Sequence, residues 1–123
     1  MFKFDDTKCY RMPAHFGGYD YAAEGTRYHD AVTISFSYTT EKTLLEAYIP
    51  EAFELVRPEV GVAFTQCRKI DWLAGSSYNL VLVSAPVRYS GARDHVEAPY
   101  VLVIWENKTA PILTGREARL LVA

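Results

Sequence analysis

One stretch of strict alternation limits the fold of this chain more than any other feature. Between Val32 and Tyr38, bulky apolar residues occupy every even position, and Thr or Ser occupies every odd position. Successive side chains of a β-strand point to opposite faces of a sheet. The pattern therefore predicts a strand with one apolar face and one hydroxyl-bearing face, and a fold built around a sheet.

Four further runs rich in Val, Leu, Phe and Tyr predict more strands, because these residues favour a half-buried pleated surface. Gly, Pro and Ser separate the runs, as is typical of turns. The expected strands cover residues 53–57, 61–67, 78–89 and 100–105, and the expected turns include residues 90–95 and 106–111. Pro86, inside the third run, predicts an edge or a bulge.

One short helix is expected between the strand at 32–38 and the next strand. Thr39 or Thr40 can cap the free N–H groups at its start. Leu44, Leu45 and Tyr48 follow at a spacing that predicts one apolar stripe along the helix.

The order of these elements predicts a single mainly-β (α+β) domain spanning residues 1–123. Five or six strands and one short helix are joined by connections of about ten residues or fewer, with no internal repeat or linker. Such short connections favour an antiparallel-rich sheet or an incomplete β-barrel. A chain of 123 residues can bury roughly two thirds of its unfolded surface, which is enough for one core.

Composition narrows the classes of partner. The net charge of −2 argues against a nucleic-acid-binding surface. The chain has no run of about 18 apolar residues and no apolar segment typical of a secretion signal, so a cytoplasmic protein is expected. Cys9 and Cys67 are then expected to be free thiols. The histidines, His15, His29 and His95, lack metal-binding spacing, and no cofactor motif occurs, so neither metal nor cofactor is expected.

Three segments occur in an order that is typical of one enzyme family. The predicted helix ends through residues 49–54, a long apolar strand follows at 78–89, and a further strand and loop lead to Gly115-Arg116-Glu117. Together they resemble the front half of the acetoacetate decarboxylase superfamily, over nearly the whole chain. The resemblance implies a β-barrel or cone fold in a C-terminally truncated family member. It also implies lyase chemistry on small keto acids, by Schiff-base decarboxylation or by aldol and dehydration reactions, without a cofactor.

The resemblance also locates the family's catalytic groups, which this sequence lacks. Family members carry the nucleophilic lysine six residues past the Glu of the Gly-Arg-Glu step, where this chain has Ala123. That lysine must be neutral to attack a ketone, and acetoacetate decarboxylase is the standard example of a lysine with a lowered pKa. The family's two carboxylates correspond to Thr65 and Leu80. These departures resemble a divergent branch of the family.

Four residues are candidates for a substrate pocket, each with an alternative role. Arg27 could bind a substrate carboxylate or lie in a solvated loop, and Arg116 could do the same or pair internally with Glu117. Glu117 is expected beside Arg116 on the pocket floor. Tyr78 could point its hydroxyl into the pocket or act as an ordinary cross-strand residue. The five lysines, Lys3, Lys8, Lys42, Lys69 and Lys108, lie outside apolar strand centres and are expected to be solvated.

Two functions stay open on the sequence alone. The first is a family member that takes a small keto acid but lacks the imine-forming lysine. The second is a non-catalytic small-molecule-binding or assembly module. Because missing strands leave open sheet edges and exposed apolar surface, a homo-oligomer is expected. Neither nucleic acid nor a membrane is an expected partner.

Overall fold

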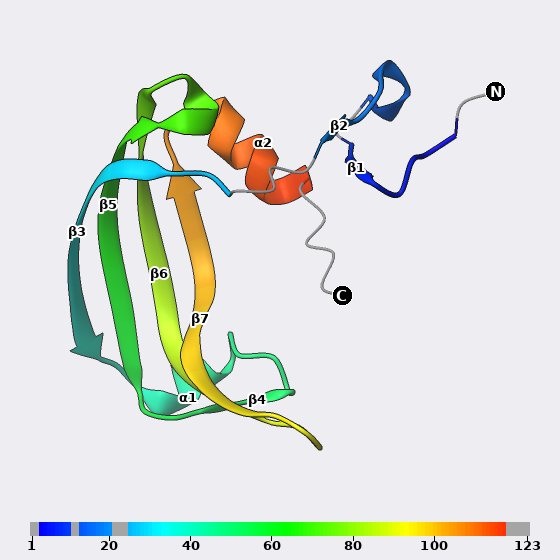
Figure 1. Ribbon diagram of the computed structural model, residues 1–123. Coiled ribbons are helices and arrows are strands. Elements are labelled where there is room, and N and C mark those ends of the chain that lie inside the picture. The colour runs from blue at the N-terminus through cyan, green and yellow to red at the C-terminus, as the bar shows by residue number, and fades with distance from the viewer. Residues whose placement is uncertain (1–2, 11–12, 21–24, 118–123) are drawn as a thin grey trace.

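The computed structural model describes residues 3–10, 13–20 and 25–117, and its main feature is one five-stranded antiparallel sheet (Figure 1). The strands are β3 (Tyr28–Thr39), β4 (Phe53–Leu55), β5 (Glu59–Ile70), β6 (Ser76–Ser90) and β7 (His95–Glu106). β5 lies between β3 and β6, while β7 and the short β4 also pair with β6. The predicted mainly-β, antiparallel fold is confirmed, and each of the five expected strands is present.

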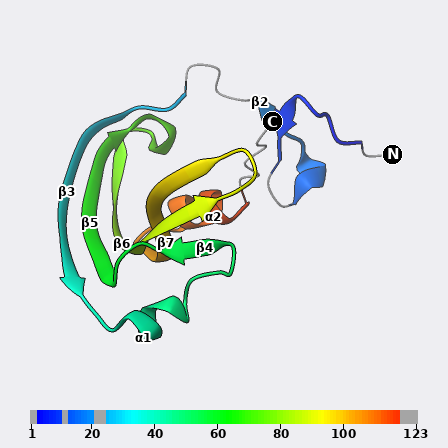
Figure 2. The same ribbon diagram turned by 90° about the horizontal axis from the view of Figure 1, so that it is seen from below.

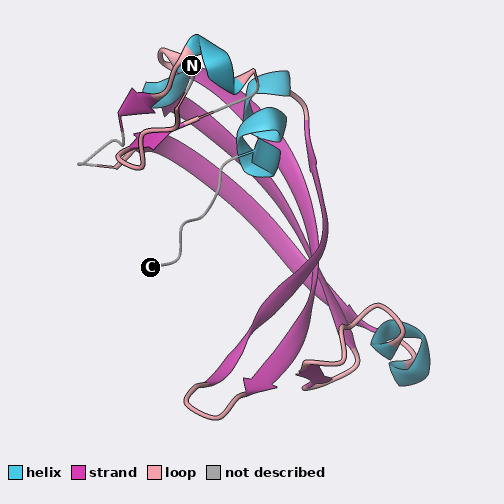
Figure 3. Ribbon diagram, turned by 90° about the vertical axis from the view of Figure 1, so that its right-hand side faces the viewer, coloured by secondary structure: helices cyan, strands magenta, loops and turns pink. Residues whose placement is uncertain are grey.

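The sheet is curved and open. Seen from below, it bends from β3 round to β7, and α2 (Thr109–Glu117) lies on the inner side of the bend (Figure 2). The strands also bow along their length (Figure 3). Within the described residues, β3 pairs only with β5, and β7 and the short β4 pair only with β6, so β3 and β7 are the two long edge strands. This part of the chain is therefore an unclosed barrel-like sheet.

A β-bulge interrupts the pairing of β6 with β7. Leu102 is an extra residue on β7, between the two residues that pair with Val83 and Ser84. A bulge of this kind increases the local twist and bends the strand. Pro86, where the sequence predicts an edge or a bulge, lies two residues beyond Ser84 and opposite Pro99. Two prolines can face each other at a pair whose N–H positions point away from the shared ladder.

The register gives the sheet two chemically different faces, because residues directly opposite one another on neighbouring strands share a face. The hydroxyl face carries Ala31, Thr33, Ser35, Ser37, Gly61, Ala63, Thr65, Cys67, Tyr78, Leu80, Leu82, Ser84, Val101, Ile104 and Glu106. The apolar face carries Val32, Ile34, Phe36, Tyr38, Val60, Val62, Phe64, Val81, Val83, Val103 and Trp105. The two faces of β3 are those that the alternation predicts.

Most of the buried apolar residues in the described part of the chain form two small clusters, and Val87 is buried outside both. The first joins α1 (Lys42–Glu46) to the sheet and contains Leu45, Leu55, Val60 and Ala85. The second lies beside a short 3-10 helix (Asp71–Leu73) and contains Cys67, Ile70 and Tyr78. The middle of the sheet has little cover on either face.

The expected threonine cap of α1 is wrong. Thr39 still belongs to β3, and the N–H of Thr40 donates to the Pro58 carbonyl at 2.9 Å. Glu41 takes the capping position and makes no side-chain hydrogen bond there. The strand therefore extends to the residue where the sequence favours a helix start.

The apolar stripe expected on α1 is reduced to one residue. Leu45 is buried, whereas Leu44 and Tyr48 are 61% and 71% exposed. A helix of five residues makes little more than one turn, so it presents a single side chain to the core.

The stretch that predicts a turn at 106–111 runs into a second helix, α2. Pro111 lies in the first turn of α2. The first four N–H groups of a helix have no partner within it, so a proline that lacks this group is tolerated there. Gly115 and Arg116, from the Gly-Arg-Glu step, consequently lie on a helix.

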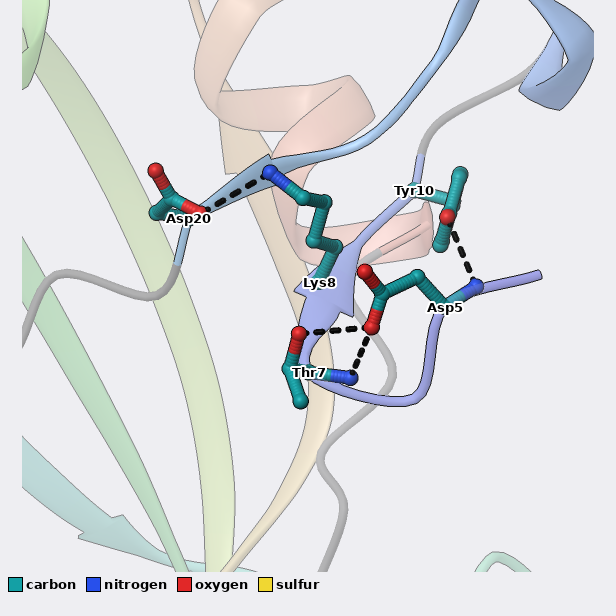
Figure 4. A network of polar contacts seen from close by, with 5 residues as sticks. All are labelled: Asp5, Thr7, Lys8, Tyr10 and Asp20. Carbon is teal, nitrogen blue, oxygen red and sulfur yellow. Dashed lines mark hydrogen bonds and ion pairs between the residues drawn. The ribbon is translucent and has the colours of Figure 1, made fainter.

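A small arm precedes the main sheet. Its two short strands, β1 (Lys8–Cys9) and β2 (Tyr19–Asp20), pair with each other and are joined through a 3-10 turn at Ala14–Phe16. The Lys8 Nζ lies 3.0 Å from the Asp20 Oδ1 across this pair (Figure 4). The N–H and the hydroxyl of Thr7 both donate to the Asp5 Oδ1, at 2.9 and 2.6 Å (Figure 4). These contacts order the arm locally.

Both cysteines are free thiols, as predicted; Cys67 is buried and Cys9 is half-buried. No helix among the described residues is long and apolar enough to span a membrane.

Candidate functional site

A row of four residues crosses the hydroxyl face of the sheet. The register places Thr33, Thr65, Leu80 and Glu106 directly opposite one another on β3, β5, β6 and β7. The hydroxyl oxygens of Thr33 and Thr65 lie 2.9 Å apart and share a hydrogen bond. The row therefore has hydroxyl groups at one end and a carboxyl group at the other.

Tyr78 lies on the same face, two residues before Leu80, and is 7% exposed. Its ring meets the Tyr28 ring edge-on, with 6.4 Å between the centroids. The indole N–H of Trp72 donates to the Tyr28 hydroxyl at 3.3 Å. Burial, and then the hydrogen bond with Tyr28, raises the pKa of Tyr78. Its phenol is therefore protonated at neutral pH and can donate a hydrogen bond.

A second bulge turns the end of β5 toward this tyrosine. The register against β6 shifts between Cys67 and Ile70, and Lys69 between them has a positive φ of 50°. The added residue re-aims the side chains that follow it. Ile70 is consequently buried in one cluster with Tyr78, while Lys69 is exposed.

Glu106 ends the row with a half-buried carboxyl. Burial raises the pKa of this carboxyl, because a low-dielectric environment disfavours its charged form. Within the described residues, Glu106 makes no hydrogen bond or ion pair, in contrast to Glu97 on the same strand, which binds Arg88. A half-buried carboxyl with a raised pKa is suited to giving or accepting a proton.

An open hollow of about 370 Å³ lies further along the hydroxyl face. Its walls are formed mainly by small residues: Ser35, Ser37, Gly61, Ala63 and Ser84, with Phe36 and Val62. Ser84 is 8% exposed, and its hydroxyl makes no hydrogen bond within the described part of the chain. A Cβ on Gly61 would lie 3.1 Å from the Ser84 Oγ, so glycine keeps this space open. The hollow thus offers an unpaired hydroxyl to a small polar molecule.

The described residues contain no group of three or more His, Cys, Asp or Glu side chains that could hold a metal ion. The candidate site is therefore built from hydroxyl groups, phenols and one carboxyl.

Comparison with known proteins connects this sheet to one family. The family model for acetoacetate decarboxylase (ADC) matches residues 11–119. The chain belongs to the acetoacetate decarboxylase family. It is also similar to the crystal structure of acetoacetate decarboxylase from Legionella pneumophila subsp. pneumophila str. Philadelphia 1, with a TM-score of 0.64 and 28% identity. The similarity covers 75% of this chain and 34% of that chain, so this chain spans about a third of that relative's length. No curated protein sequence matches.

Two residues of the row on the hydroxyl face are positions that the sequence resemblance singles out. Thr65 and Leu80 are the positions at which the resemblance places the family's carboxylates, and here they lie directly opposite each other. Two carboxylates on directly paired residues would be close enough to shift each other's pKa. In this chain a hydroxyl and an aliphatic side chain stand there, and the carboxyl of the row is Glu106, one strand further along.

The structure places the four predicted pocket residues in three parts of the fold. Tyr78 lies on the hydroxyl face. Arg27 directly precedes Tyr28; its carbonyl accepts a hydrogen bond from a backbone N–H of the 3-10 helix after β5, and its side chain is exposed. Arg116 is exposed near the end of α2, and Glu117 is the last residue of α2, with its side chain outside the described part. The roles of these residues stay predictions. Ala123 also lies outside the described residues.

Sequence reasoning missed three residues of this site: Tyr28, Ser84 and Glu106. Ser84 could have been found, because it continues the spacing of two that begins at Tyr78 on the same strand. Tyr28 lies at the start of β3 beside the predicted Arg27 and carries no local signal of its own. Glu106 was hidden by the bulge at Leu102.

The lysines that the structure describes have polar or open surroundings. Lys8 donates to an aspartate of β2, and this hydrogen bond raises the pKa of Lys8. Lys42 pairs with a glutamate one turn later on α1, and Lys108 donates to a serine hydroxyl at 2.8 Å. Lys3 and Lys69 are exposed. The pKa of Lys8 is therefore raised, whereas imine formation needs a lysine with a lowered pKa.

Proposed function

We propose that this acetoacetate decarboxylase-family chain binds a small keto acid on its hydroxyl face without forming an imine. The observation that carries the proposal is the buried, protonated phenol of Tyr78 beside the row of Thr65 and Leu80. Family membership supplies the substrate class. The chemistry of the face supplies the manner of binding.

A small keto acid presents a carbonyl oxygen and a carboxylate, both of which accept hydrogen bonds. The hydroxyl face offers matching donors in Tyr78, Thr65 and Ser84, with Leu80 beside them to contact the hydrocarbon part. A carboxylate that leaves water also needs a cation, since an unpaired charge is costly to bury. Arg27, next to Tyr28, is the proposed cation, and Arg116 on α2 is the second candidate.

The family's lyase chemistry requires a neutral, desolvated lysine amine. Position 123 holds alanine, and each of the five lysines of this sequence is exposed or bound to a polar group rather than surrounded by apolar side chains. Thr65 and Leu80 likewise supply no carboxylate. This chain is therefore proposed to retain recognition of the keto acid and to lack Schiff-base decarboxylation and the related aldol and dehydration reactions.

One experiment tests both halves of the proposal. Pyruvate or acetoacetate is titrated into the protein by NMR, and the same samples are treated with borohydride and measured by intact mass. Binding without a covalent adduct is expected, and a lysine-dependent acetoacetate decarboxylase serves as the positive control. Tyr78→Phe should weaken binding about fivefold, since removing one hydrogen bond costs about 1 kcal/mol.

The matched control is Tyr89→Phe. Tyr89 packs against Phe53 at the other end of β6, with 5.9 Å between ring centroids, so its hydroxyl should not affect affinity. An adduct mapped to a single lysine would overturn the absence of imine chemistry. Lack of binding at millimolar concentration, or equal losses in both tyrosine variants, would overturn recognition at Tyr78.

An assembly role is the second candidate function, and the open β3 edge favours it.

A further inference from the structure

β3 is an edge strand with a long unpaired side. It spans 12 residues and pairs only with β5 within the described residues (Figure 1). The register with β5 is unbroken from Asp30 to Thr39. The N–H and C=O groups that point away from β5 along this length form a ready template for another strand.

β3 lacks the features that normally protect such an edge. Residues 31–40 contain no charged residue, no proline and no glycine, and no bulge interrupts them. The opposite edge strand, β7, carries Glu97, Pro99 and the bulge at Leu102. Charges, prolines and bulges are the usual means by which edge strands avoid pairing with another chain. The two long edge strands therefore differ: β7 carries features that prevent pairing with another chain, and residues 31–40 carry none of them.

The apolar face beside this edge is also open. Val32, Ile34, Phe36 and Tyr38 are 48%, 67%, 53% and 52% exposed. Phe64 on β5 stacks on Phe36, with 6.2 Å between the ring centroids, and is itself half-exposed. The exposed surface therefore reaches from the edge strand onto its neighbour.

A groove of about 380 Å³ continues this surface toward α1. It is lined by Tyr38, Thr40, Leu44, Leu45, Tyr48, Val60, Val83, Leu102 and Val103. None of these side chains is charged. The strand edge, the apolar side chains and the groove consequently form one uncharged surface.

We propose that a second copy of this chain adds its own β3, antiparallel, to this edge, so that two sheets become one continuous sheet in a two-fold dimer. A strand that pairs with itself sets its own residues against one another, which any charge would disfavour. The uncharged run from Ala31 to Thr39 meets this condition over about 30 Å. The two-fold arrangement also closes the assembly at two chains.

The register of the two copies follows from the alternation. The apolar faces of the two copies lie on the same side of the joined sheet only when even-numbered residues of one copy pair with even-numbered residues of the other. The longest uncharged overlap of this kind within β3 is centred on Ser35, which then lies opposite Ser35 of the second copy. Ile34 lies opposite Phe36 of the second copy, and Val32 opposite Tyr38. The backbone pairing and these side chains together form the proposed interface.

The first test is the oligomeric state, measured by light scattering on the full chain. A mass twice 13.9 kDa is expected for the wild type. Ile34→Lys should reduce it to one copy while circular dichroism shows an intact fold, because the side chain is exposed in the single chain. Val96→Lys, which alters a 52% exposed residue on the other edge strand, should leave the dimer intact. A single-copy mass for the wild type, or a dimer of Ile34→Lys, would overturn the proposal.

The second test fixes the register. Ser35→Cys should give a covalent dimer on mild oxidation, since directly opposite Cα atoms are about 4.5–5.5 Å apart and within disulfide range. Ser37→Cys is the matched control on the same face; in this register its copies are four residues out of alignment and should not cross-link. Cross-linking of Ser37→Cys instead would contradict pairing centred on Ser35. The dimer does not depend on the proposed keto-acid binding, so the two proposals fail separately.

Discussion

At the scale of single residues, Glu106 shows how the sheet sets the chemistry of a side chain. Its carboxyl is held on the hydroxyl face opposite Leu80, where burial raises its pKa and no cation in the described part of the chain compensates. Raising a carboxyl pKa in the folded state means that ionisation opposes folding. Below the ordinary value of 4.5 both states are protonated and the effect vanishes. As pH rises from that value through the folded-state pKa, stability is lost.

Glu106→Gln should therefore stabilise the protein at pH 7 and have almost no effect near pH 4. The carboxyl is only partly buried, so the gain is limited to about 0.5 kcal/mol, or roughly 2 °C in Tm. Differential scanning calorimetry at the two pH values measures it. Glu51→Gln, which changes an exposed glutamate in the turn after α1, should leave Tm unchanged at both. A Glu106→Gln variant that melts below the wild type at pH 7 would show that the carboxylate has a stabilising partner.

At the scale of elements, the bulge at Leu102 explains why the sequence predicts the strands but not the face on which Glu106 lies. Pairing continued from Ser90 and His95 without interruption would set Trp105 opposite Leu80, and Glu106 would fall on the apolar face. The extra residue Leu102 shifts the register by one and exchanges the two faces for the rest of β7. The strands, their order along the chain and the faces of β3 follow from alternation and turn residues. Pro86, where the sequence predicts an edge or a bulge, lies two residues from the shift at Val83 and Ser84, but the extra residue Leu102 on β7 has no local sequence signal.

The second helix was missed for a different reason. Proline and asparagine near residue 110 are typical of turns, but Pro111 sits where a helix tolerates it, and Gly115 then lies inside α2. A Cβ at Gly115 would have no neighbour within 4 Å, so the position has room for a side chain. Glycine at this position weakens a helix, whereas in a turn it would be favoured.

Gly115→Ala should raise the free energy of unfolding by about 0.5–1 kcal/mol, because alanine has the higher helix propensity. Gly75→Ala is the contrasting variant: Gly75 has a positive φ of 78° in the turn before β6, so alanine there should cost about 1–2 kcal/mol. Urea unfolding of both variants gives the two values. A loss of stability in Gly115→Ala would mean that Gly115 does not lie inside a regular helix.

At the scale of the whole molecule, the candidate site was less predictable than the fold. The resemblance to the family locates Tyr78, Thr65 and Leu80, and the register then shows that the last two face each other. It gives no information on Glu106, because the face on which this residue lies depends on the bulge in the pairing of β6 with β7. Long-range register is a property of the assembled sheet and is only weakly encoded in local composition.

The small size of the buried core also affects how the whole molecule is stabilised. Most of the described core lies in two small clusters on an open sheet, and only Ile70 and Ala85 are completely buried. Much of the apolar face is exposed in the described part of the chain, and a second copy could cover it. If pairing along β3 supplies that cover, unfolding is coupled to dissociation, and Tm must rise with protein concentration. Each tenfold increase adds about 1.4 kcal/mol per dimer, which corresponds to roughly 2–4 °C in Tm. Ile34→Lys should melt at a lower temperature that does not change with concentration, whereas Val96→Lys should follow the wild type. A wild-type Tm that is independent of concentration would show that the two clusters alone hold the sheet together.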